Sequence, residues 1–328
     1  MRQTLSMLVA AALFCSVVPA MADPLVHTYS IVARDARTGE IGVAVQSHWF
    51  AVGSNVTWAE AGVGAIATQS FIDPGYGVRG LAMLREGKAA PDVLRALLEA
   101  DPQRETRQVA IIDAQGRVAA HTGATCIQAA GHRVGSQFSV QANLMANDRV
   151  WPAMAEAFER ATGDLAERML AALDAAESAG GDIRGRQSAA LLIVRPQGTG
   201  RPWAGADRVF DLRVDDHPAP LTELRRLVRL QRAYDHANRG DELMTGGKVD
   251  EALAQYSKAA EYAPEIVELP FWQAVTLASV GREAEAMPIF ARVFAKEPRW
   301  AELVPRLPAA KLLPDDAALV KRIVGQRR

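Results

Sequence analysis

Near its start the chain alternates apolar and polar residues in a pattern that predicts a β-hairpin. Apolar residues occupy every second position over 41–45, directly after a polar turn, which is typical of a half-buried strand. A symmetric hairpin pairs Asp35 with Glu40, and counting outward places Thr28 opposite Ser47. Residues that lie directly opposite in an antiparallel pair point to the same face. We therefore expect the side chains of Thr28 and Ser47 to be neighbours.

Similar patterns predict the other elements of the first 218 residues. We expect strands at 55–59, 62–69, 108–113, 117–122, 188–194 and 209–214, and helices at 77–86, 90–98, 151–161 and 165–178. Strands joined by hairpins and interrupted by paired helices favour an α+β fold, in which sheets are covered by helices, over a doubly wound α/β sheet.

The last third of the chain contains a repeat with a period of 34 residues. Five positions recur at that spacing: Gly247, Ala252, Tyr256, Ala259 and Pro264 match Gly281, Ala286, Phe290, Val293 and Pro298. This is the period of the tetratricopeptide repeat, in which each unit is a pair of antiparallel helices. We predict an all-α domain over 219–328, with repeats at 233–266 and 267–300, a lead-in helix and a closing helix. Because about three repeats are usually needed for stability, we expect this domain to be stabilised by packing against the first domain or against another subunit.

Composition and the N-terminus bear on where the protein works. The 328 residues are 49% hydrophobic and carry a net charge of −1, which argues against disorder and against nucleic-acid binding. Arg2 precedes an apolar run over 7–18, and Ala20-Met21-Ala22 matches a signal-peptidase site. We expect a signal peptide at 1–22, a mature domain over 23–218 without a membrane anchor, and a periplasmic or secreted location.

Signatures of metal and cofactor sites are lacking. The histidines show no zinc-binding spacing, and neither a P-loop nor a dinucleotide fingerprint occurs. No metal and no cofactor are therefore expected. Cys126 is the one cysteine of the expected mature chain, and a small buried apolar side chain is its favoured interpretation.

Two segments of the predicted hairpin, TYSIVARD from Thr28 and GEIGVAVQS ending at Ser47, resemble the start of the catalytic segment of N-terminal-nucleophile (Ntn) hydrolases. The isoaspartyl peptidase and asparaginase group is the most similar. On this resemblance Thr28 takes the nucleophile position and Ser47 that of a supporting hydroxyl. The alternatives are an inert strand threonine and a serine that caps a strand.

A closer resemblance covers nearly all of residues 28–218. The segments SIVARD, GVAVQS, GVGAIATQS, VAAHTGATC, GGDIRGRQSAALLIV and DLRVDDHP are similar to a bacterial and archaeal family catalogued as domain of unknown function 1028. That family's fold is assigned to the Ntn-hydrolase class, and some relatives carry a C-terminal tetratricopeptide-like or peptidoglycan-binding extension. The resemblance implies a four-layer αββα sandwich followed by the helical domain.

The chemistry implied is hydrolysis of a small amide, isopeptide or peptidoglycan-derived substrate. The free α-amine of an N-terminal threonine, with a pKa of about 7.7 to 8.0, can take the proton of its own hydroxyl. Five residues would separate Thr28 from a signal cleavage after Ala22, so a second cleavage is required. Backbone N–H groups over 62–65, or the Gln187 amide, are the expected oxyanion donors.

Substrate recognition is expected from a polar cluster before the strand at 188–194. Asp182, Arg186 and Gln187 suit a carboxylate or amide group, although an exposed charged loop is the alternative. Asp73 lies in a predicted turn and is a candidate lip residue.

The competing hypothesis is a non-catalytic periplasmic binding or assembly protein. In it, the tetratricopeptide-like helices hold a protein partner in a concave groove or join two copies of the chain.

Overall fold

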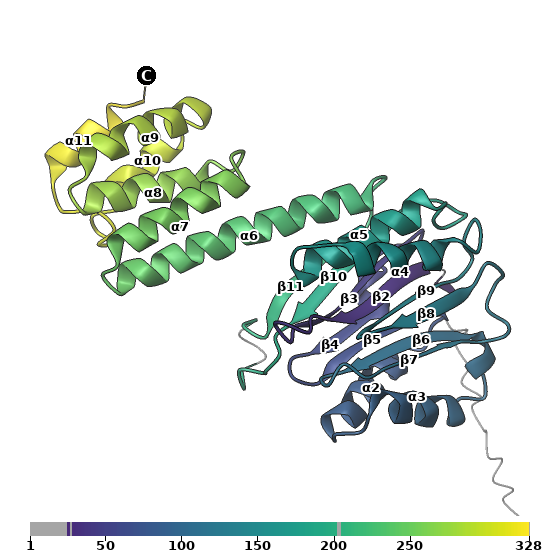
Figure 1. Cartoon of the computed structure of the whole chain (residues 1–328). Coiled ribbons are helices and arrows are strands. Elements are labelled where there is room, and N and C mark those ends of the chain that lie inside the picture. The colour runs from purple at the N-terminus through teal and green to yellow at the C-terminus, as the bar shows by residue number, and fades with distance from the viewer. Residues whose placement is uncertain (1–24, 27, 202–204, 328) are drawn as a thin grey trace, which may run out of the picture.

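The computed structural model describes residues 25–26, 28–201 and 205–327. The predicted signal peptide and the expected first mature residue, Asp23, lie outside these residues. Within them the chain has a mixed α+β part with two antiparallel sheets and a helical C-terminal part (Figure 1), so the predicted α+β class is confirmed. No helix of the described residues is long and apolar enough to cross a membrane.

The first sheet has five strands in the described chain, in the order β1-β5-β6-β7, with β4 also paired to β5. These strands are β1 (Leu25–Val26), β4 (Thr57–Glu60), β5 (Gly64–Phe71), β6 (Arg107–Asp113) and β7 (Val118–Thr122). Strands β4 and β1 share one edge of β5, since β4 pairs with Gly64 to Ala67 and β1 pairs with Ser70 and Phe71.

The second sheet has six strands in the described chain, in the order β11-β10-β3-β2-β9-β8. They are β2 (Thr28–Arg34), β3 (Ile41–Ser47), β8 (Gly131–Gly135), β9 (Phe138–Ala142), β10 (Ser188–Val194) and β11 (Arg208–Val214). The hairpin β8–β9 and the short β1 were not among the predicted strands.

The predicted register of the first hairpin is confirmed. Thr28 lies opposite Ser47, and the Asp35 N–H donates to Glu40 O at 2.9 Å. The turn is held by the Asp35 carboxylate, which accepts the backbone N–H groups of Arg37 and Thr38 at 2.8 and 3.0 Å. This is the local hydrogen bonding that favours Asp at a turn.

Helices cover the outer faces of both sheets (Figure 1). Beyond the short α1 (Gly53–Val56), they are α2 (Gly75–Arg85) and α3 (Ala90–Glu99) on the first sheet, and α4 (Val150–Arg160) and α5 (Leu165–Ser178) on the second. Alternation along each strand separates three apolar clusters. In β2, for example, Ile31 packs under α4 and α5 while Val32 faces the other sheet.

The helical part begins with α6, a helix of 26 residues that belongs to both parts of the chain. The helices are α6 (Pro220–Thr245), α7 (Val249–Tyr262), α8 (Glu268–Ser279), α9 (Glu283–Lys296), α10 (Trp300–Leu303) and α11 (Ala317–Val324). Near its start α6 buries Leu224 and Val228 in the core under α5, and near its end it buries Leu243 in the core of the helical part. Figure 1 shows α6 running from one part to the other.

The 34-residue period is visible in the geometry. Helices α7 and α9 have 14 residues each and begin 34 positions apart. Gly247 and Gly281, each following the helix before them, have φ values of 73° and 80°. Both adopt the left-handed conformation that glycine accepts most readily after a helix.

Candidate functional site

Thr28 and Ser47 form a buried hydroxyl pair where β2 begins and β3 ends. The Thr28 Oγ1 donates to the Ser47 Oγ at 3.1 Å, and neither residue is exposed to solvent. Ser188, the first residue of β10, lies opposite Ser47 on the other side of β3. Because directly opposite residues share a face, three hydroxyl side chains form a row across β2, β3 and β10 between the two sheets.

The backbone carbonyl of Thr28 is held by two donors from other elements. Gln69 of β5 donates its Nε2 to Thr28 O at 3.0 Å, and the Asn143 N–H, just after β9, donates to the same oxygen at 3.1 Å. Gln69 also accepts from the Ser30 Oγ at 2.6 Å and donates to the Gln108 Oε1 at 2.7 Å. One buried amide therefore ties the first residues of β2 to β5 and β6 of the opposite sheet.

The sequence interpretation missed the glutamine and asparagine side chains of this network. Gln141 donates to the Ser30 Oγ at 2.6 Å, and Asn143 donates to the Gln108 Oε1 at 2.9 Å. None of these amide side chains is exposed. A signal was present in the sequence. Strands β5, β6 and β9 each carry a glutamine at an inward position near the same end of the sandwich, where an apolar residue is the usual choice.

Backbone strain gathers at the same end of the sandwich. Ser70, Leu144 and Ala51, which lie at or just beyond the ends of β5, β9 and β3, have φ values of 74°, 56° and 52°, and Ala129 beside Leu144 has 55°. Such conformations cost non-glycine residues of order 1 kcal/mol or more and cluster at functional sites. These four residues and the buried hydroxyl pair mark this end as the candidate site.

The predicted recognition residues lie beside this end, but their charges have partners within the chain. Asp182 accepts the His48 N–H at 3.1 Å and pairs with Arg184 at 2.7 Å. Arg186 pairs with Glu177 of α5. The Gln187 N–H donates to Ser47 O at 3.1 Å, which brings Gln187 next to the hydroxyl pair, while its side chain donates to Asp216 at 3.2 Å.

Asp73 shapes the start of α2. Its carboxylate accepts the Gly75 N–H at 2.7 Å and pairs with Arg79 at 2.8 Å. It follows β5 at the end where Gln69 lies, so it stands on the rim of the candidate site rather than in the buried network.

The expectation that the backbone over 62–65 supplies oxyanion donors is wrong. The Gly62 N–H donates to Arg195 O and the Val63 N–H to Glu60 O. Gly64 opens β5, whereas Gln69, the residue that contacts Thr28, lies five positions further along the same strand. At about 3.3 Å per residue, these two ends of β5 are roughly 16 Å apart.

A second polar cluster lies on the other face of the second sheet. Tyr29 donates to Glu177 at 2.7 Å and also contacts the amide of Gln46. Burial raises the pKa of Tyr29 well above its usual value, and the Glu177 carboxylate raises it further. The phenol therefore stays neutral and acts as a hydrogen-bond donor beneath α5.

Cys126 is buried, as the sequence interpretation favoured, with its Sγ 3.4 Å from Arg107 O. Burial raises the pKa of its thiol, which works against a reactive thiolate. In the part of the chain that the structure describes, no group of three or more His, Cys, Asp or Glu side chains could hold a metal ion.

Comparisons with known proteins place the α+β part in a family. The sequence model of the Family of unknown function (DUF1028) matches residues 28–224. The crystal structure of protein SPO2555 from Silicibacter pomeroyi, a DUF1028 protein, is 32% identical and superposes with a TM-score of 0.55. That match covers 61% of this chain and 84% of SPO2555. Among curated proteins no match was found. Since the family match begins at Thr28 and spans more than half of the sequence, the chain belongs to the DUF1028 family.

Proposed function

We propose that this protein is an exported amide-bond hydrolase of the N-terminal-nucleophile type, with Thr28 as the nucleophile. The observation that carries the proposal is the Thr28–Ser47 hydroxyl pair, held 3.1 Å apart at the first residue of β2 on the inner face of a sheet. Two antiparallel sheets packed face to face with helices outside them agree with an Ntn-hydrolase-like αββα sandwich.

In this proposal a second cleavage frees the α-amine of Thr28. The amine takes the hydroxyl proton, and Oγ1 attacks the substrate carbonyl. Ser47, whose hydroxyl can rotate to donate or accept, orients Oγ1 at the moment of attack. The amine of the substrate leaves with the proton, and water then hydrolyses the ester, which restores the Thr28 hydroxyl.

Full burial of Thr28 fits this scheme when the residues ahead of it are removed. Preorganised donors in a site that excludes water stabilise developing charge more than donors in water do. Gln69 and Asn143, which donate to the Thr28 carbonyl oxygen, hold the start of β2 in such a buried environment. Asp182, Arg186, Gln187 and Asp73 are proposed as substrate-binding residues on the rim.

The test is the mature N-terminus. Protein recovered from the export compartment is examined by intact mass and N-terminal sequencing, together with Thr28→Ala and the exposed control Thr222→Ala. We expect the wild type and the control to start at Thr28 and Thr28→Ala to retain the preceding residues. Wild-type protein that starts at Asp23 would refute the proposal, because the amine that serves as base would remain in a peptide bond.

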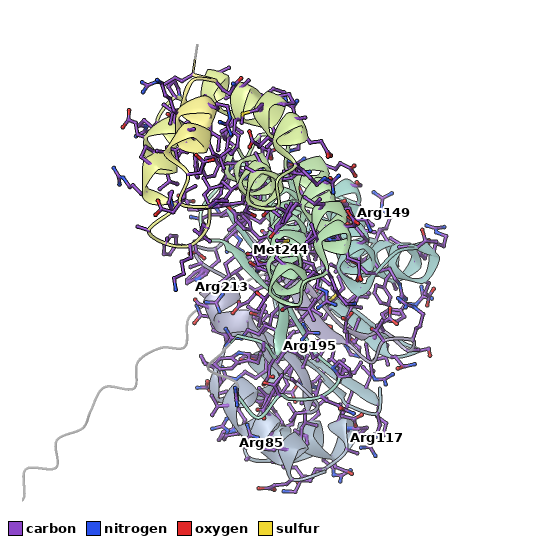
Figure 2. The ribbon with its side chains drawn as sticks, turned by 90° about the vertical axis from the view of Figure 1, so that its left-hand side faces the viewer. Arg85, Arg117, Arg149, Arg195, Arg213 and Met244 are labelled. Atoms are coloured by element: carbon purple, nitrogen blue, oxygen red, sulfur yellow. The ribbon has the colours of Figure 1, made fainter. Side chains whose placement is uncertain are left out.

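A second candidate function is partner binding by the helical part, which we propose to be tetratricopeptide-like. One observation favours it: a groove of about 470 Å³ lies between α6 and α8, lined among others by Met244, Tyr256 and Trp272. Met244 is labelled near the end of α6 in Figure 2. If this is the whole function, Thr28→Ala leaves partner binding unchanged, whereas Trp272→Ala weakens it.

A further inference from the structure

We infer that the edge of β5 at Ser70 and Phe71 binds the acyl half of the substrate as an extended peptide. This inference rests on the proposed function and names the class of substrate. In the described chain that edge is occupied by β1, which pairs antiparallel with it: Leu25 lies opposite Phe71 and Val26 lies opposite Ser70.

The first step of the argument is that the chain changes sheets just before Thr28. Val26 belongs to the first sheet, through β5, whereas Thr28 belongs to the second, through β3. Leu25 and Val26, the described residues ahead of the candidate nucleophile, therefore lie along one strand, and the nucleophile itself opens another. A bond cleaved directly before Thr28 has β1 on its acyl side.

The second step is that the β1 position is adjacent to the site. Ser70 follows Gln69, whose side chain is 3.0 Å from the Thr28 carbonyl oxygen. Strand β4 covers the same edge of β5 only as far as Ala67. The edge from Thr68 to Phe71 is thus the part of the first sheet that faces the beginning of β2, and β1 pairs with its last two residues.

The third step concerns cleavage in trans. When Thr28 cleaves a separate substrate, it attacks the substrate carbonyl from the direction in which it attacks the carbonyl ahead of it in its own chain. The acyl residues of the substrate therefore take the place that β1 holds in the uncut chain. Thr28 Oγ1 forms an ester with the acyl carbon, the C–N bond breaks, and the amine departs with the proton. Water then cleaves the ester to a free acid. A strand edge supplies main-chain hydrogen bonds to an extended peptide, which is the basis of β-augmentation.

The surroundings favour apolar side chains on this peptide. Ile127 and Ile183 both hydrogen-bond through their backbones to Leu144, at 3.2 and 3.3 Å, and Leu144 directly follows Asn143 of the site. The two isoleucines are 36% and 62% exposed. Exposed apolar side chains gathered beside a polar site are typical of a ligand-binding rim.

The experiment frees the edge in the full chain and measures binding rather than turnover. The N–H groups of neighbouring residues in a strand point to opposite sides, so the N–H of either Leu25 or Val26, but not of both, points toward β5. The double variant Leu25→Pro/Val26→Pro removes that donor, while Leu25→Ala/Val26→Ala retains it as the matched control. The probe is the peptide acetyl-Pro-Leu-Val-His-amide, and its binding to each variant is measured by saturation-transfer NMR. Both variants carry Thr28→Ala so that the probe is not consumed.

We expect the proline variant to bind the probe at least tenfold more tightly than the alanine variant, because a tethered β1 competes at a high effective concentration. A probe N-methylated at Leu and one N-methylated at Val should differ, since only one of the two N–H groups faces the strand. Equal binding to both variants, or no binding to either, overturns the inference. Failure of the proposed function looks different, because the probe would still bind while the wild-type N-terminus stays at Asp23.

Discussion

Arg232 of α6 donates to Glu167 of α5 at 2.6 Å and pairs with Asp164 at 2.7 Å. These contacts lie beside Leu224 and Val228, which α6 buries in the core beneath α5. The helix that leads into the repeats is therefore packed onto the α+β part and does not behave as a free linker.

We expect Leu224→Ala to lower the free energy of unfolding of the α+β part by about 2 to 5 kcal/mol, since a fully buried leucine leaves a cavity when truncated. Denaturant unfolding followed by circular dichroism measures the change. The control is Leu312→Ala in the helical part, where the leucine is 45% exposed, and this substitution should change stability little. An effect of Leu224→Ala below about 1 kcal/mol would contradict the packing described.

Gln69 connects three groups that have no access to water. Gln69→Leu leaves the Ser30 hydroxyl and the Gln108 amide oxygen each short of one partner. The Gln108 oxygen and the Thr28 carbonyl oxygen each keep a donor from Asn143, whereas the Ser30 proton loses its acceptor. At about 1 to 3 kcal/mol for a buried group left unsatisfied, we expect a loss of roughly 1 to 3 kcal/mol in the free energy of unfolding. Gln115→Ala, at an exposed turn, is the control. Equal unfolding midpoints for the two variants would argue against the network.

Asp101 should make stability depend on pH in the acid range. Burial alone would raise its pKa, but hydrogen bonds from Arg107, the Gln103 N–H and Tyr76 outweigh burial and hold the pKa below the usual 3.8. The carboxylate therefore stabilises the fold above about pH 4, and this contribution is lost as the pH falls through the lower folded-state pKa.

Asp101→Asn is the variant that tests this pH dependence. At pH 6 we expect it to be less stable than the wild type, and the gap should narrow steadily as the pH falls from about 4 towards 2. Thermal unfolding across this range provides the comparison. A gap that stays constant with pH would mean that the charge of Asp101 contributes nothing.

Gly240 should be intolerant of even one added carbon. A Cβ at this position would lie 2.5 Å from a ring carbon of Tyr256, and the ring is anchored by the hydrogen bond from its hydroxyl to Asp241 at 2.7 Å. We expect Gly240→Ala to destabilise the helical part by about 1 to 3 kcal/mol, although alanine favours a helix over glycine by about 1 kcal/mol. The control is Gly246→Ala at the end of α6, where the nearest atom is 3.5 Å away. A more stable Gly240→Ala variant would show that α6 and α7 can move apart.

We expect a substitution at Ser70 to stabilise the protein, in contrast to the substitutions above. Its φ of 74° lies in the left-handed region, where a side chain costs about 1 to 2 kcal/mol relative to glycine. Ser70→Gly should therefore raise the melting temperature. If the strained conformation positions the β5 edge for substrate, the same variant should also bind the extended peptide probe less tightly. Unchanged stability would show that the strain is relieved elsewhere.

The sequence predicted the β2–β3 hairpin to the residue because two independent signals agree there. The Asp35 turn fixes where the chain reverses, and apolar alternation fixes which side chains face inward, so the Thr28–Ser47 pairing follows from counting. The repeat period is equally local, because each helix pair copies the spacing of small and aromatic residues.

The hairpin β8–β9 escaped prediction for a physical reason that also concealed the polar network. In β9, Phe138, Val140 and Ala142 alternate with Ser139 and Gln141, a pattern that would leave the polar side chains in solvent, yet all five residues are buried. Its partner β8 has one apolar residue, Val134, and that residue is exposed. Gln69 donates to Gln108, and Gln141 joins the same network through Ser30, only after β2, β5, β6 and β9 meet in the fold. An inward glutamine is visible in each strand, but the local sequence does not show which distant residue it contacts. The strained backbone at Ser70 and Leu144 likewise arises from the assembled sheets.

The sharing of α6 between two cores also sets an order of events during synthesis. The core beneath α5 includes Leu221, Leu224 and Val228, so it cannot be completed until the chain has been made beyond residue 228. Folding one domain at a time from the N-terminus, the usual course for multidomain chains, is therefore delayed here. The α+β part completes its core only after α6, the first helix of the helical part, has been made. If synthesis stops before α6, the apolar surface of α5 stays exposed.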